Sequence, residues 1–121
     1  MLQHVTLEVP RDRVRDCVRF WELLGFREIV PPPLLRDRFV WVERNGTHIH
    51  LMPLDDPTVP EHAHPAVVGD SAAIDALERA GFEPRPGSNA WDAPRWFVRD
   101  PAGHRVEVMS APPPSGAVVR D

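Results

Sequence analysis

Two stretches of sequence decide the fold of this 121-residue chain: residues 39–52, FVWVERNGTHIHLM, and residues 96–109, WFVRDPAGHRVEVM. The first stretch superposes on the second without a gap when it is shifted by 57 positions. The superposition matches Gly46 with Gly103, Ile49 with Val106, His50 with Glu107 and Met52 with Met109. Internal similarity of this kind is typical of a duplicated structural unit, so we expect two copies of one module.

The sequence before the first stretch predicts a strand and a helix. Residues 2–9 alternate between apolar and polar side chains, as a half-buried strand does. Apolar residues recur on one helical face from residue 11 to residue 24, and Gly25 stands where glycine often ends a helix. The strands and the hairpin turn that we expect to follow are 26–30, 38–43, Asn45-Gly46 and 47–52. The first copy is therefore a βαβββ unit.

The same order of elements returns after a Pro-rich, acidic linker. Asp70 or Ser71 caps a helix that runs to about Ala80. The strands expected in this copy are 64–69, 95–99 and 105–109, and the expected loops are 31–37 and 84–94. The expected boundaries are module one at 1–53, the linker at 54–63, module two at 64–110 and a loose Pro-rich tail at 111–121. The predicted fold class is α+β, with two tandem βαβββ modules in one domain.

Composition limits the chemistry that the chain can perform. All 14 basic residues are Arg, there is one Cys, and Lys and Tyr are absent. Schiff-base chemistry, a disulfide and a Cys-rich zinc site are therefore excluded. The net charge of -4 argues against nucleic acid. No apolar run approaches a membrane span, and the first residues do not resemble a signal peptide. A single Cys suits a reducing compartment, so we expect a cytoplasmic protein.

Histidine and carboxylate side chains must then carry any chemistry, and the duplication selects four of them. His4 matches His64, and His50 matches Glu107. The strand alternation points each of these side chains away from its apolar neighbours. Three imidazoles and one carboxylate suit a divalent first-row metal: Zn, Ni, Co, Mn or Fe. The sequence therefore predicts a metal site formed by His4, His50, His64 and Glu107.

Four motifs carry a resemblance to a known family. They are residues 4–9 (HVTLEV), 20–26 (FWELLGF), 64–70 (HPAVVGD) and 100–107 (DPAGHRVE). In this order, and with the duplication, the chain resembles the vicinal oxygen chelate superfamily. That superfamily holds glyoxalases, fosfomycin-resistance and bleomycin-resistance proteins, and extradiol dioxygenases.

The resemblance implies curled mixed sheets that enclose a metal and ligand cavity, with the helices on the convex face. It also implies a homodimer with sites at the interface, where His4 and His50 of one chain meet His64 and Glu107 of the other. His50 departs from the family, because glyoxalase-like members often carry Glu or Gln on that strand. Either His50 is a metal ligand, or it contacts the substrate and leaves a site of two histidines and one carboxylate.

The remaining assignments concern the reaction. A metal with open positions favours a small substrate with two neighbouring oxygens and acts on it as a Lewis acid. Because Lys and Tyr are absent, Glu107 is the first candidate for the catalytic base. The side chains that we expect to line the substrate pocket are His48, Arg105, Met52, Met109, Trp41 and Trp96. Two alternatives remain: Trp41 and Trp96 pack in the core, and Arg105 pairs with an acidic neighbour rather than with the substrate.

Four functions compete at this stage. The favoured one is a metal-dependent lyase or isomerase of the glyoxalase type, which stabilises an enolate or alkoxide. The second is a metal-dependent thiol transferase of the fosfomycin-resistance type. The third is an extradiol-type dioxygenase, and the fourth is a non-enzymatic drug-binding protein of the bleomycin-resistance type. Drug-binding members generally lack the metal ligands, which this chain retains.

Overall fold

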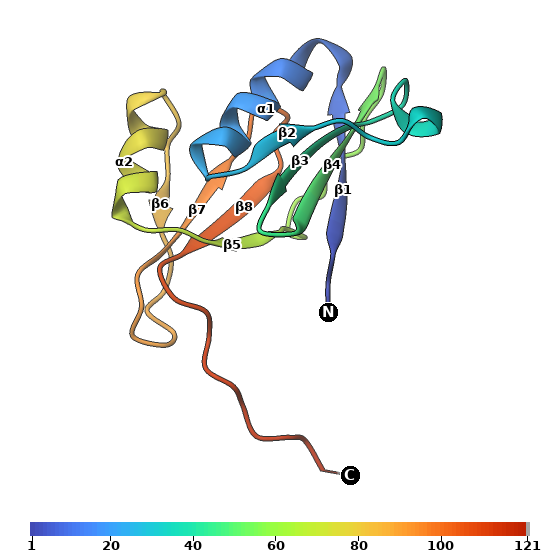
Figure 1. Ribbon diagram of the computed structural model, residues 1–121. Helices are drawn as coiled ribbons and strands as arrows, with labels where there is room; N and C mark the ends of the chain where they lie inside the picture. Colours follow the sequence, from blue (N-terminus) through green and yellow to red (C-terminus); the bar gives the residue numbers. More distant parts are fainter. Residues whose placement is uncertain (121) are drawn as a thin grey trace.

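The computed structural model describes residues 1–120, and its first module is the expected βαβββ unit (Figure 1). Strands β1 and β4 pair in parallel, and the other neighbours pair antiparallel, in the order β1-β4-β3-β2. The elements of this module are β1 (His4–Pro10), the 3-10 turn η1 (Arg11–Arg13), α1 (Val14–Leu23), β2 (Arg27–Ile29), the 3-10 turn η2 (Pro33–Leu35), β3 (Val40–Arg44) and β4 (Thr47–Leu54).

The second module repeats this topology as a separate sheet in the order β5-β8-β7-β6. Its elements are β5 (Ala66–Val68), α2 (Ser71–Arg79), β6 (Arg85–Pro86), β7 (Arg95–Arg99) and β8 (Arg105–Met109). The α+β class and the tandem βαβββ modules are therefore confirmed, although the two sheets do not close into a barrel. Two details were predicted wrongly: β5 begins at Ala66 rather than at residue 64, and β6 lies within a segment expected to be a loop.

Local signals in the sequence account for the helix boundaries. The Asp70 side chain accepts a hydrogen bond from the Ala73 backbone N–H, which caps α2. Both helices are followed by a glycine with positive φ, Gly25 at 89° and Gly81 at 94°. That conformation is unfavourable for residues with a Cβ, so these glycines end the helices.

The two hairpins differ in the length of their turns. In the first hairpin, Arg44 pairs with Thr47, which leaves the two-residue turn Asn45-Gly46. In the second hairpin, Arg99 pairs with Arg105, which leaves a five-residue turn, residues 100–104. The Asp100 carboxylate shapes the longer turn by accepting from the backbone N–H groups of Ala102 and His104.

The two modules share one hydrophobic core. Buried side chains of both helices and of both sheets form a single cluster, and the rings of Phe20 and Phe82 join the modules at a centroid distance of 5.1 Å. Polar contacts reinforce this junction. His104 Nε2 donates to the Glu8 carbonyl at 2.6 Å, and the Arg44 guanidinium donates to the Val68 carbonyl at 2.6 Å. The two modules are therefore one packing unit.

The ends of the chain contribute little to this packing. The described part of the C-terminal tail, residues 112–120, has neither helix nor strand and runs away from the body of the protein (Figure 1). Residue 121, which the tail prediction included, lies outside the described residues. Within residues 1–120, no helix has the length and apolar character needed to cross a membrane.

Candidate functional site

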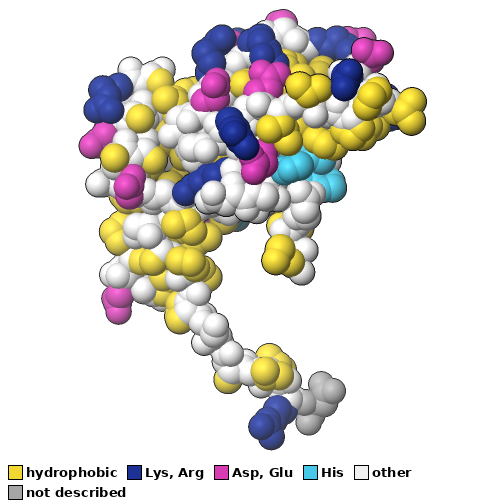
Figure 2. Space-filling model, viewed as in Figure 1, with side chains coloured by type: hydrophobic (Ala, Val, Ile, Leu, Met, Phe, Trp, Pro, Cys, Tyr) yellow, Lys and Arg dark blue, Asp and Glu magenta, His cyan; other side chains and the backbone are white. Residues whose placement is uncertain are grey.

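The first group of candidate ligands lies on the polar face of the first sheet, opposite the helix. The His4 and His50 rings stack at a centroid distance of 4.1 Å, and the Trp41 ring stacks on His50 at 4.0 Å. These rings and His48 line an open cavity of about 540 Å³. Figure 2 shows a patch of histidine side chains on the surface beneath this sheet. We call His4 and His50 the first half-site.

A hydrogen bond fixes which ring nitrogen of His4 is a donor, and burial keeps the His50 ring neutral. Gln3 Nε2 donates to the Gly46 carbonyl, so the side-chain oxygen of Gln3, Oε1, accepts from His4 Nδ1 at 2.7 Å. His4 Nδ1 is therefore a donor, and Nε2 is the ring nitrogen that remains to bind a metal. Burial, together with the neighbouring His4 and His48, lowers the pKa of His50 to about 4. His50 is therefore neutral at pH 7, which is the form that binds metals.

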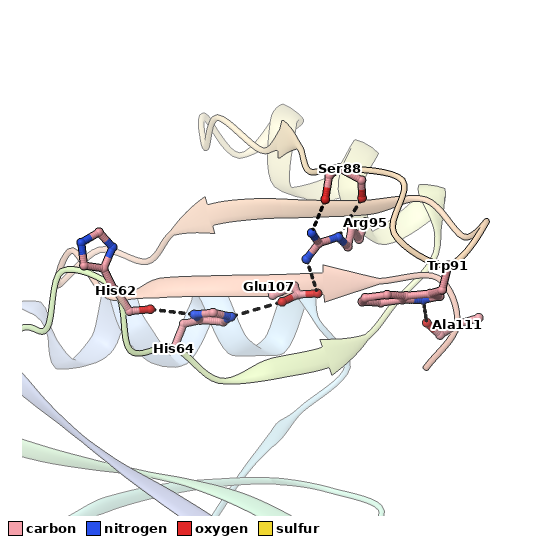
Figure 3. A network of polar contacts seen from close by, with 7 residues as sticks. All are labelled: His62, His64, Ser88, Trp91, Arg95, Glu107 and Ala111. Carbon is pink, nitrogen blue, oxygen red and sulfur yellow. Dashed lines mark hydrogen bonds and ion pairs between the residues drawn. The ribbon is translucent and has the colours of Figure 1, made fainter. Parts of the chain in front are cut away.

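The second group of candidate ligands lies at the second sheet, with Glu107 on β8 and His64 two residues before β5 (Figure 3). His64 Nε2 is 3.2 Å from Glu107 Oε1, and Glu107 is 6% exposed. His64 Nδ1 donates to the His62 carbonyl at 2.7 Å, because a carbonyl oxygen can only accept. This bond directs Nε2 of the ring toward Glu107, as the second hydrogen bond of a metal-binding histidine does. We call His64 and Glu107 the second half-site.

Arg95 completes the second half-site and was not among the predicted site residues. Its guanidinium donates to Glu107 Oε2 at 3.2 Å, to the Ser88 carbonyl at 2.9 Å and to the Ser88 hydroxyl at 2.7 Å (Figure 3). It also lies over the Trp91 ring, at 5.1 Å from the centroid. The Arg95 side chain is only 16% exposed, so these contacts hold Glu107 in a fixed orientation.

The structure brings the four predicted ligands together as two pairs. Within residues 1–120, no three His, Cys, Asp or Glu side chains lie close enough to hold one metal ion. A single chain thus presents two half-sites, one on each sheet.

The predicted pocket residues divide between these surfaces. Trp41 and His48 lie beside His50, and the His48 Nδ1 to His50 Nε2 distance is 3.0 Å. Met52 and Met109 are half-buried and share the strand faces of His50 and Glu107. The Arg105 guanidinium lies over the Phe97 ring.

Trp96, predicted to line the substrate pocket, lies away from the candidate ligand Glu107. It pairs with the buried Val108 and packs against the hydrophobic core, so its side chain lies on the face opposite Glu107. The residue that pairs with Glu107 is Phe97. The ungapped superposition concealed Phe97 and Arg95, because the longer second turn moves β7 by one position relative to β8. A one-residue shift exchanges the two faces of a strand. Hairpin pairing measured from each turn, rather than one common offset, would have found both residues.

The donor set of the second half-site fits a metal ion. Two donors bonded to one ion at about 2.1 Å each lie about 3.0–3.4 Å apart, and the His64–Glu107 distance falls in that range. The first half-site supplies two imidazoles, but their ring planes are nearly parallel, at an interplanar angle of 17°, so in-plane lone pairs of the two rings cannot converge on one ion. A ring rotation at His4 or His50 is needed before both can bind the same ion.

Solved structures show the same fold. A glyoxalase family protein from Bacillus anthracis has a TM-score of 0.80 and 27% identity, over 90% of this chain and 93% of that one. A glyoxalase/dioxygenase from Nostoc punctiforme has a TM-score of 0.72 and 18% identity, over 90% and 89% of the two chains. A lactoylglutathione lyase from Agrobacterium tumefaciens has a TM-score of 0.68 and 15% identity, over 90% and 92%. No protein-family model and no curated protein matches the sequence. The chain has the glyoxalase/dioxygenase fold of the vicinal oxygen chelate superfamily.

Proposed function

We propose that this protein is a metal-dependent lyase or isomerase of the glyoxalase type, which acts on a small substrate with two neighbouring oxygens. The observation that carries the proposal is the second half-site. There an imidazole nitrogen and a buried carboxylate oxygen lie at the spacing of two ligands of one ion, and each is held by a further hydrogen bond.

We also propose that the complete site forms between two copies of the chain. Each copy carries two half-sites that do not meet within the chain. In a symmetric dimer the same two surfaces occur twice, so the first half-site of one copy can face the second half-site of its partner. Such a pairing would bring three imidazoles and one carboxylate together, a donor set suited to Zn, Ni, Co, Mn or Fe.

When bound, the metal would supply Lewis-acid stabilisation of negative charge on a substrate oxygen. Glu107 would accept the substrate proton at Oε1 once that oxygen is released from the metal, because one oxygen cannot bind the ion and hold the proton at the same time. Arg95 holds Oε2, so the carboxylate keeps its position while its other oxygen changes protonation. The three hydrogen bonds that Arg95 donates fix the guanidinium in turn.

His50 favours one alternative within this proposal. Its Nε2 already contacts His48 Nδ1, and its ring is held between His4 and Trp41. These contacts suit a substrate-binding histidine, which would leave His4, His64 and Glu107 as a three-ligand site. That arrangement resembles the fosfomycin-type thiol transferases and the dioxygenases, so those reactions are the second candidate function.

A mixing experiment tests the shared metal site. One variant carries His4→Ala and His50→Ala, and the other carries His64→Ala and Glu107→Ala. Each variant alone should bind no metal by elemental analysis. After the two are unfolded together and refolded, half of the heterodimer sites regain all four ligands, so metal binding should return. An equal mixture that stays free of metal, while wild type binds one ion per chain, would exclude the shared site. Wild type without metal after loading with each of the five candidates would overturn the proposed function.

A single variant then decides the role of His50. In the three-ligand alternative, His50→Ala keeps its metal. In the four-ligand site, His50→Ala loses metal as His4→Ala does.

A further inference from the structure

Phe97 connects the second half-site to a neighbouring cation. The His64 ring meets the Phe97 ring edge-to-face at a centroid distance of 5.5 Å. The Arg105 guanidinium carbon lies 4.0 Å from the centroid of the same ring. Residues 105 and 107 lie on one face of β8, and two residues along a strand span about 7 Å. Arg105 is therefore one side chain away from Glu107.

Arg105 has no anionic partner among the described residues, 1–120. Among residues 1–120, no carboxylate pairs with it and no oxygen accepts a hydrogen bond from it, although the residue is half-buried. Arg95 on the neighbouring strand differs sharply, because all of its bonds are made to Glu107 and Ser88. The Phe97 ring holds the Arg105 guanidinium by a cation–π contact, which leaves its N–H groups free to donate.

A cavity of about 500 Å³ opens beside Arg105. Its charged and aromatic lining consists of Arg85, Arg99, Arg105, Glu83, Phe82 and Phe97. The three guanidinium groups against one carboxylate give this lining an excess of positive charge. The nearest Arg–Glu pair, Arg85 with Glu83, is 3.7 Å apart with both side chains about 80% exposed, so it neutralises little of that charge.

We infer that this cavity, which we call the Arg105 cavity, binds the carboxylate or phosphonate group of an anionic substrate. A planar guanidinium donates two parallel hydrogen bonds to such a group. The inference rests on the proposed function for the rest of the substrate, whose neighbouring oxygens would reach the metal beside Glu107. The spacing of Arg105 and Glu107 then selects small molecules in which the anionic group and the chelating oxygens are separated by only a few bonds.

The test uses protein freed of metal with EDTA, so that anion binding is measured apart from metal binding. Backbone amide NMR signals are followed during titration with acetate, with methylphosphonate and with acetamide, a neutral molecule of the shape of acetate. We expect saturable shifts around residues 97–105 with at least one of the two anions and none with acetamide. The stronger of the two anions identifies the substrate group.

Two variants of Arg105 are compared with one control. Arg105→Gln should weaken anion binding at least tenfold, and Arg105→Lys should weaken it several-fold because the charge remains but the planar fork is lost. Arg79→Gln removes an exposed charge from α2 and should leave binding unchanged. Equal binding by Arg105→Gln and Arg79→Gln, absence of saturable shifts, or equal shifts with acetamide would overturn the inference.

The outcome is separable from that of the proposed function. Anion binding by a protein that takes up no metal would remove the proposed reaction and keep the Arg105 cavity. Metal binding without any response to the anions would keep the proposed reaction and remove the Arg105 cavity as an anion site.

Discussion

The two hairpins arise from similar sequences, but their turns place the partner strands differently. A two-residue turn pairs Trp41 with His50, and a five-residue turn pairs Phe97 with Glu107. The strands that carry His50 and Glu107, β4 and β8, superpose at the offset of 57 positions. Their partner strands, β3 and β7, superpose only after a further shift of one position. Because each hairpin keeps an aromatic ring opposite its candidate ligand, pairing across the strands is preserved where the linear alignment is not.

The largest difference between the hairpins should be in metal affinity, after replacement of the residue that lies beside the candidate ligand. Arg95→Gln removes the guanidinium from Glu107, and we expect metal affinity to fall about tenfold to a hundredfold. The corresponding position in the first hairpin is Phe39, where Phe39→Leu should change metal affinity less than twofold. Isothermal titration with the metal that co-purifies with wild type measures both. Equal losses in the two variants would mean that Arg95 does not position Glu107.

The turns themselves should differ in their contribution to stability. Asp100→Ala deletes the acceptor of two backbone N–H groups in the longer turn, where the side chain is 4% exposed. We expect the free energy of unfolding to fall by about 2 kcal/mol in urea denaturation. Asn45→Ala in the short turn replaces a residue at φ 51° and should cost about 1 kcal/mol. A larger loss at Asn45 would contradict this ranking.

Glycine tests a property that the two turns share. Gly46 and Gly103 have φ values of 85° and 93°, and a Cβ at either position meets nothing closer than 3.9 Å. The cost of alanine should therefore be conformational alone, about 1 kcal/mol at each position. Urea denaturation of Gly46→Ala and Gly103→Ala should give equal losses. A clearly greater loss at Gly103 would reveal a steric contribution from Val59.

The last comparison concerns the matched ligand positions, where the effect is absent at neutral pH and appears only in acid. The pKa of His50 falls from 6.5 in the unfolded chain to about 4 in the folded protein, so the unfolded chain binds more protons between these values. His50 therefore destabilises the metal-free protein progressively as the pH drops from 6.5 to 4, and has no such effect at pH 7.5. Ring NMR signals should titrate near pH 4, and the loss of stability on acidification should be smaller in His50→Asn. A His50 midpoint near 6.5 would contradict this expectation.

The duplication was enough to predict the modules, their parallel pairing strands and the strand faces of His4, His50 and Glu107, whereas His64 lies two residues before β5. Alternating polarity fixes which face a side chain takes once the register is known. The register of a hairpin depends on its turn, and the five-residue turn around Asp100 has no counterpart in the Asn45-Gly46 turn. For this reason Arg95 and Phe97 were overlooked, and Trp96, expected in the pocket, packs against the core instead.

Distances between the modules were beyond the reach of the sequence. Matched positions say that His4 and His64 are equivalent, but equivalence within a repeat does not make two residues neighbours. The contacts of Phe20 with Phe82 and of His104 with Glu8 decide how the sheets meet. These contacts depend on packing that no local pattern encodes.

The shared core also has a consequence for how the molecule comes apart. Phe20 of the first module and Leu77 of the second are buried in the same cluster, with no exposed surface on either. An isolated half would expose its share of that cluster to water, at a cost of about 25 cal/mol for each Å² of apolar surface. The two modules therefore arose by duplication but do not fold independently, and heat or urea should unfold them in a single cooperative transition.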